Sequence, residues 1–396
     1  MLDWKIGEDD DTPESLAEAS PRRRWRVPRW LWMGTLGIVL VAALTSAAYF
    51  FLGVRDGETK ARAEIQQAAD LEIWARQNDN RVVFFESLDP TAPRDWRTRQ
   101  VRDWREGEEW RTGAKVVRVE LNADLAWVEL ELTNKAGKVY REGRFYRRGA
   151  DGRWRRSAGS DEFWGPSRVI ETKYFQVQHH LRDAPYVRQA TEGLDEWYGQ
   201  VRADFGLPAP TGSRVIDVVA DPEAASSANL VVKSPLLDLR TGDDTPANNL
   251  RGWMAYKLAE ELMNEVLPPT MRTSSTAYRT LLTGVLYWEV SQVAPFTPSE
   301  QTELRTILAQ ASASNSLIPP SQLLPTMPDE AGQRLLWPQQ VATGAFIADT
   351  YGRASFAKLL RQTGTSLEQT LPRALGVSYA AFEQGWRRYV QQKYTS

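Results

Sequence analysis

The chain has 396 residues and a nearly balanced charge, with 49 Lys and Arg against 51 Asp and Glu. This balance excludes a nucleic-acid binder that works by bulk positive charge, because contacts to phosphates need a basic surplus. Cysteine is absent, which excludes disulfides, thiol nucleophiles and metal sites built on thiolates. The two histidines, His179 and His180, are adjacent, so the sequence contains no His-x-x-x-His zinc signature.

An uncharged stretch from Trp30 to Val54 predicts a single transmembrane helix within residues 29–54. Roughly 20 apolar residues cross the hydrocarbon core at about 1.5 Å per residue, and aromatic residues at both ends are typical of a membrane interface. Five arginines within residues 22–29 precede the stretch. The positive-inside rule therefore predicts a location in the cell membrane, with residues 1–28 as a disordered cytoplasmic tail and the rest of the chain extracytoplasmic.

Residues 55–166 are predicted to form an α+β domain. Residues 60–81 have a helical spacing of apolar residues, and from Val117 to Leu132 apolar and polar residues alternate. Turns at residues 134–137 and 150–152 flank a strand from Val139 to Arg148, so a helix is followed by an antiparallel meander. This order, with its closing Asp-Gly-Arg-Trp hairpin, resembles the nuclear-transport-factor-two-like (SnoaL-like) cone fold.

The tryptophans and arginines of this segment each allow two interpretations. The tryptophans either fill the core of the cone or line a ligand pocket. The arginine-rich run at residues 141–156 is either a solvated hairpin paired with nearby acids or a surface for an anionic partner. The tryptophans concerned are Trp74, Trp96, Trp104, Trp110, Trp127, Trp154 and Trp164.

Residues 167–396 are predicted to form a mostly helical domain with a small N-terminal sheet, which is again an α+β plan. Strands are expected at 173–180 and 215–220. Adjacent side chains of a strand point to opposite faces, so His179 and His180 cannot both bind one metal ion. Helices are expected at 184–205, 251–267, 278–293, 297–311, 339–350, 355–363, 366–375 and 379–393.

Motifs near the C-terminus resemble a known family. Residues 344–352 read GAFIADTYG, followed by FAKLL at 356–360 and ALGVS at 374–378, and Ser234-Pro235 precedes the central helix. With these motifs, residues 170–394 resemble the peptidase-MA-like domain of the gluzincin zinc metallopeptidases. The resemblance implies a central His-Glu-x-x-His helix in which both histidines bind zinc and the glutamate activates water, with a third ligand, Glu, on a later helix.

The signature positions of that family hold other residues in this chain. Both ligand histidines are replaced, by Glu260 and Asn264, whereas the water-activating glutamate is retained as Glu261. The third ligand position falls on Thr283. One carboxylate, one amide and one hydroxyl form a weak oxygen donor set that does not suit tight zinc binding. We therefore expect no metal, no cofactor and no catalytic residue at these positions.

Together these features predict a bacterial, single-pass, membrane-anchored pseudo-peptidase that is not an enzyme and that binds a peptide or protein partner outside the membrane. The membrane itself, contacted through Trp30 to Val54, is the other expected partner, and nucleic acid is not. Two alternatives stay open. In the first, the cone domain binds a small apolar ligand and the peptidase-like domain is a spacer. In the second, carboxylates such as Glu260 and Glu261 serve an unrecognised hydrolase.

Overall fold

The structure is a computed structural model that describes residues 57–105, 111–223, 225, 228–272, 276–363 and 366–395. Its contacts divide the chain into two units, Met1–Thr59 and Lys60–Ser396, and nearly all described residues belong to the second. The predicted transmembrane stretch lies outside the described residues. None of the described helices combines the length and the apolar character that a membrane crossing needs. The described residues form an α+β fold.

A first, antiparallel sheet follows three helical segments: residues 57–77, α2 (Arg81–Glu86) and α3 (Arg94–Arg105). Its strands are β1 (Arg111–Asn122), β2 (Leu125–Asn134), β3 (Val139–Arg148) and β4 (Trp154–Ser157), in the order β1-β2-β3-β4. The predicted helix and meander are thus confirmed. In β1, however, the pairing with β2 shifts between Val116 and Arg118. Val116 and Val119 are therefore buried, whereas the predicted alternation placed Val117, Val119 and Leu121 on one face.

Both faces of β2 are covered by other parts of the chain. The sequence pattern accounts for the burial of only one of these faces. Ala126, Val128 and Leu130 pack against Ile65 and Ala69 of the first helix. The opposite face of β2 has Leu125, Trp127 and Glu129. The polar Glu129 predicts that this face is exposed to solvent. Trp127 is nevertheless buried, because Phe163 and Leu236 from later parts of the chain cover it.

A second sheet follows α4 (Asp161–Trp164). β5 (Ser167–Glu171) pairs antiparallel with β6 (Phe175–His180), and β6, β7 (Arg214–Val219) and β8 (Leu230–Lys233) are parallel. The connection from β6 to β7 contains a short 3-10 turn (Leu181–Asp183), α5 (Ala184–Thr191) and α6 (Leu194–Asp204). A single helix was predicted at 184–205, but Gly193 adopts a φ of 76° and separates the two, because this left-handed conformation ends a helix.

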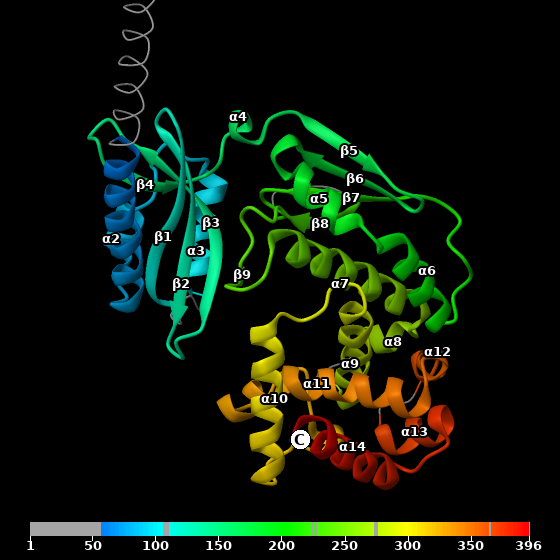
Figure 1. Cartoon of the computed structure of the whole chain (residues 1–396). Helices are drawn as coiled ribbons and strands as arrows, with labels where there is room; N and C mark the ends of the chain where they lie inside the picture. Colours follow the sequence, from blue (N-terminus) through cyan, green and yellow to red (C-terminus); the bar gives the residue numbers. More distant parts are fainter. Residues whose placement is uncertain are drawn as a thin grey trace, which may run out of the picture. The chain divides into compact units, whose positions relative to one another are not determined.

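The remainder is helical, and its arrangement is shown in Figure 1. Two helices begin earlier than predicted: α7 begins at Pro246 after its Thr245 N-cap, and α11 begins at Glu330 and continues through Pro338. The helices are α7 (Pro246–Val266), α8 (Pro269–Arg272), α9 (Ala277–Ser291), α10 (Pro298–Ala313), α11 (Glu330–Tyr351), α12 (Ala354–Leu360), α13 (Leu367–Leu375) and α14 (Tyr379–Tyr394), with a 3-10 turn at Pro320–Gln322.

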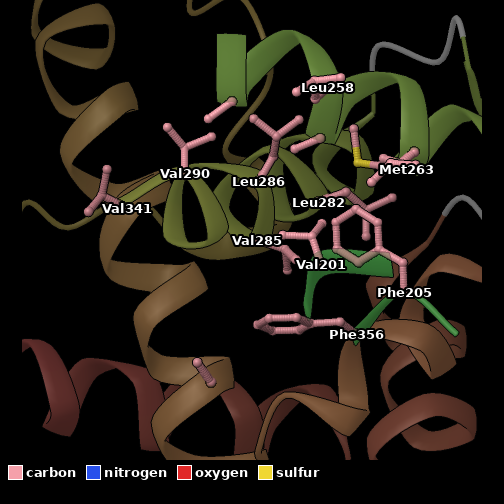
Figure 2. Close-up of a cluster of buried hydrophobic side chains, with 14 of the residues drawn as sticks. Val201, Phe205, Leu258, Met263, Leu282, Val285, Leu286, Val290, Val341 and Phe356 are labelled. Carbon is pink, nitrogen blue, oxygen red and sulfur yellow. The ribbon is translucent and has the colours of Figure 1, made fainter. Parts of the chain in front are cut away.

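One large apolar core joins these helices to the second sheet. Figure 2 shows side chains from different helices meeting there, among them Val201, Leu258, Leu286 and Phe356. Within this core α9 and α11 approach very closely. A Cβ added at Gly344 of α11 would lie 1.9 Å from the carbonyl oxygen of Gly284, so this contact requires glycine.

The two sheets belong to one continuous unit. A short strand before α7, β9 (Arg240–Thr241), pairs with β3 of the first sheet. Trp127 Nε1 donates to the Leu236 carbonyl oxygen at 3.3 Å, and Arg240 forms a buried ion pair with Glu129. At this junction, residues that follow β7 and β8 line one cavity together with residues of β3 and β4.

Candidate functional site

Three of the four positions predicted from the peptidase resemblance, Glu260, Asn264 and Thr283, lie along the seam between α7 and α9. On α7, Tyr256, Glu260 and Asn264 are four residues apart and therefore share one helix face. On α9, Arg279, Thr283 and Tyr287 have the same spacing. The Tyr256 and Tyr287 ring centroids are 5.9 Å apart, and Glu260 interacts electrostatically with Arg279. The structure thus brings the Glu260, Asn264 and Thr283 positions to one seam.

The polar groups in this seam are only partly paired, and Arg279 Nη1 is buried without a hydrogen bond to a described residue. Burial lowers the pKa of Arg279, and the carboxylate of Glu260 opposes this shift by stabilising the guanidinium. Thr283 Oγ1 donates to the Arg279 carbonyl oxygen at 3.0 Å, within its own helix. Asn264 Oδ1 is buried and accepts no hydrogen bond from a described residue. At the three ligand positions of the family this chain therefore has three different groups. Glu260 is a carboxylate that interacts with a nearby cation, Asn264 is an amide, and Thr283 is a hydroxyl that already donates a hydrogen bond within its own helix.

Glu261 points to another element. Its carboxylate lies 2.5 Å from the Arg214 guanidinium at the start of β7, and both side chains are exposed, at 45% and 40%. Consecutive helical residues are about 100° apart, so Glu260 faces α9 while Glu261 faces the sheet. The two carboxyls consequently form no acid–base pair across a shared substrate position.

The histidines do not reach this seam. His179 Nδ1 lies 3.0 Å from the Arg168 carbonyl oxygen of β5, and burial lowers the pKa of His179. His180 Nδ1 lies 3.2 Å from the Gly165 carbonyl oxygen, and its ring is beside Trp164. The prediction of opposite faces is confirmed. Within the described ranges, no three His, Asp or Glu side chains gather closely enough to hold a metal ion.

The tryptophans of the first sheet divide between the two interpretations. Trp127, Trp154 and Trp164 are buried, as the core interpretation requires, whereas Trp74 is 48% exposed. Trp164 also lines a cavity of about 950 Å³, together with the half-buried Trp96. Trp110 and the side chain of Trp104 lie outside the described residues.

A buried cluster of charges forms part of the floor of that cavity. Arg144 donates to Glu72 at 3.0 Å and to Glu142 at 2.8 Å, and Arg156 donates to Glu72 at 2.7 Å. Burial opposes ionisation of Glu72, yet the nearby guanidiniums lower the pKa of its carboxyl to about 2. The sequence interpretation of residues 141–156 as a solvated hairpin holds for Arg155, which pairs with Asp151, but not for Arg144.

A second buried charged group was not predicted at all. Glu289 on α9 is fully buried between Asp204 of α6 and Arg353, whose Nη2 donates to Glu289 at 3.3 Å. Arg353 Nε also donates to Asp204 at 2.7 Å. Burial and the nearby Asp204 carboxylate together raise the pKa of Glu289 to about 9, although Arg353 opposes the shift. The only signal in the sequence was a glutamate on the apolar face of α9.

No protein-family model matches this sequence, and no match was found among curated proteins.

Proposed function

We propose that this protein is a single-pass, membrane-anchored extracytoplasmic pseudo-peptidase whose C-terminal domain binds a peptide or protein partner without cleaving it. In this proposal residues 29–54 are the anchor, residues 55–166 the cone domain and residues 167–396 the degenerate peptidase-MA-like domain. The proposal is supported chiefly by the seam between α7 and α9, where Glu260 interacts electrostatically with Arg279 and Thr283 donates to its own helix.

A zinc ion at this seam would meet unfavourable electrostatics. The Arg279 cation interacts with Glu260 at the position that a zinc ligand would need, so a divalent cation would have to overcome its repulsion. The retained Glu261 is paired with Arg214. Without a Lewis acid, a carboxylate alone does not supply the several kcal/mol of transition-state stabilisation that amide hydrolysis requires. The side chains around the seam nevertheless suit binding, since Trp253 is 46% exposed beside Tyr256.

Catalysis is tested with the purified full chain incubated with zinc and a pool of peptides. We expect no hydrolysis and no stoichiometric zinc. Hydrolysis that is lost both on adding a chelator and in the Glu261→Gln variant would refute the inactive state. The fold of that variant is expected to be intact, because the exposed ion pair that it weakens stabilises the protein by about 1 kcal/mol or less.

The peptidase resemblance is tested separately, by substitutions that restore the family's zinc ligands. The combined variant Glu260→His, Asn264→His and Thr283→Glu supplies the family's donor set, and we expect it to bind one zinc ion more tightly than the wild type does, although the retained Arg279 opposes binding. The matched control, Glu261→His with Glu265→His, has two histidines at the same spacing on the adjacent face and should bind zinc more weakly. Equal zinc affinity in the two variants would contradict the assignment of the signature positions.

Membrane orientation is tested by cysteine labelling, which is unambiguous because the native chain has no cysteine. We expect Ser396→Cys to react with a membrane-impermeant maleimide while the cell membrane is intact. Ser20→Cys should react only after that membrane is broken. The reverse pattern, or equal labelling of both positions, would contradict the proposed topology.

A second candidate function is supported by the cavity of about 950 Å³ against the first sheet. Small-molecule sites commonly have volumes of about 300–1,000 Å³ and aromatic walls, and Trp96 and Trp164 provide such walls. In this proposal the first sheet with its junction is a small-ligand-binding module.

A further inference from the structure

The polar groups of the cavity between the two sheets define the charge of the ligand that it would take. Three of them come from separate elements: Gln100 from α3, Arg156 from β4 and Lys233 from the end of β8. These residues are far apart in the sequence and meet at one cavity. Their proximity therefore results from the tertiary fold and is not a local property of one hairpin or one helix face.

Each of these three side chains has hydrogen-bonding capacity that the described residues do not use. Gln100 is only 8% exposed, and its Oε1 accepts no hydrogen bond from a described residue. The side chain of Arg156 is 11% exposed and donates through Nη1 to Glu72, its one hydrogen-bond partner among the described residues. Lys233 Nζ donates to no described residue, although it interacts electrostatically with Glu142 and Asp238.

The two cationic groups, Arg156 and Lys233, require an acceptor on the ligand, whereas Gln100 Oε1 would accept a hydrogen bond from a donor on it. Arginine and lysine side chains have donors and no acceptor, and charge-assisted hydrogen bonds to an anion are stronger than those to a neutral group. The half-buried position of Lys233 strengthens this preference, since charges interact more strongly away from water.

Three of the five acids that line the cavity are exposed, whereas Glu142 is buried and Asp221 is half-buried and paired with Arg99. Asp95, Asp161 and Glu223 are exposed at the rim, whereas Arg111 and Arg144 are buried in the floor beside Glu142. An entering anion would therefore meet the guanidiniums at the inner end, and an apolar body behind it would lie against the indoles of Trp96 and Trp164.

We propose that this cavity binds a small organic anion, with its carboxylate or phosphate at Arg156 and Lys233 and its aromatic or apolar body against Trp96 and Trp164. This inference rests on the second candidate function, and it replaces the purely apolar ligand that the tryptophans alone suggested.

The experiment is calorimetric titration of the purified full chain in detergent with benzoate, phenyl phosphate, inorganic phosphate and the neutral benzamide. We expect saturable binding of benzoate or phenyl phosphate, and the tighter of these two identifies the anionic group. Inorganic phosphate should bind more weakly because it lacks the aromatic body. Benzamide should bind roughly tenfold more weakly than benzoate, which corresponds to the loss of one charge-assisted hydrogen bond.

Two variants locate the site. Lys233→Met removes the ammonium at similar side-chain length, and we expect roughly tenfold weaker anion binding. Lys257→Met removes the same charge from an exposed position on α7 and should leave binding unchanged. Absence of binding by both aromatic anions, or equal effects of the two substitutions, would overturn the proposal. Equal affinity for benzamide and benzoate would overturn the anion class alone and would leave a small-ligand function in place.

Discussion

Replacing the buried Glu289 by glutamine tests whether this carboxyl keeps its proton in the folded protein. The pKa of Glu289 is raised from 4.5 to about 9, first by burial and then by Asp204. Between these two pH values the folded protein holds a proton that the unfolded chain releases, so stability falls as the pH rises. The stability that this proton provides is fully present below about pH 4.5 and is lost by about pH 9.

The magnitude follows from the proton linkage. One proton difference changes the free energy of unfolding by about 1.4 kcal/mol per pH unit. From about pH 5.5 to about pH 8 the wild-type protein should lose about 3 kcal/mol relative to Glu289→Gln. The side chain is 0% exposed, so solvent screening does not reduce this figure. Glutamine retains an acceptor for Arg353, and its amide N–H replaces the O–H of the protonated carboxyl as the donor to Asp204, which keeps the local contacts.

The assay is urea unfolding of the full chain at several pH values in this interval. The difference between the free energies of unfolding of the variant and the wild type should grow steadily with pH. Glu171→Gln, at an exposed carboxyl on the edge strand β5, is the matched control and should follow the wild-type profile. Parallel pH profiles for Glu289→Gln and the wild type would refute the conclusion that Glu289 is protonated.

Two further predictions concern packing. Gly344→Ala would place a Cβ 1.9 Å from the Gly284 carbonyl oxygen and force α9 from α11, so we expect a loss of at least about 2 kcal/mol in urea unfolding. Gly199→Ala in α6, where no atom lies within 4 Å, should instead stabilise by up to about 1 kcal/mol, and equal effects at the two glycines would contradict this account. Phe356→Ala should cost about 3–5 kcal/mol because the ring is fully buried. The same substitution at Phe85, which is 42% exposed, should lower the melting temperature much less, and similar losses would argue against the core in Figure 2.

Much of the fold could be predicted from local patterns. Strand β3 has the predicted bounds, Val139–Arg148, because turn residues flank an alternating segment. Two of the errors occurred where the backbone conformation departs from a regular period. Gly193 divides a predicted helix, and the bulge near Val116 changes which residues of β1 face the core. Periodicity continues across such positions in the sequence, so it does not show them.

The candidate site was predictable in position but not in its contacts. The spacing of Glu260 and Asn264 places both on one face of α7 from sequence alone. That Glu260 faces Arg279, and Glu261 faces Arg214, depends on how α9 and β7 pack against α7. These partners are close in space and distant in the sequence, so no local pattern indicates them.

The sequence by itself determined which side chains are available for chemistry. It has no cysteine, one adjacent pair of histidines and a near balance of charges. Together with the periodicity of its segments, it also determined an α+β chain. The tertiary structure alone decided which charges are buried. Arg144 meets Glu72 and Arg353 meets Glu289 across long separations in the chain. The neighbouring guanidiniums lower the pKa of Glu72, whereas burial raises the pKa of Glu289. The physical reason is that desolvation depends on every neighbour in three dimensions, whereas hydrogen-bonding capacity belongs to each side chain alone.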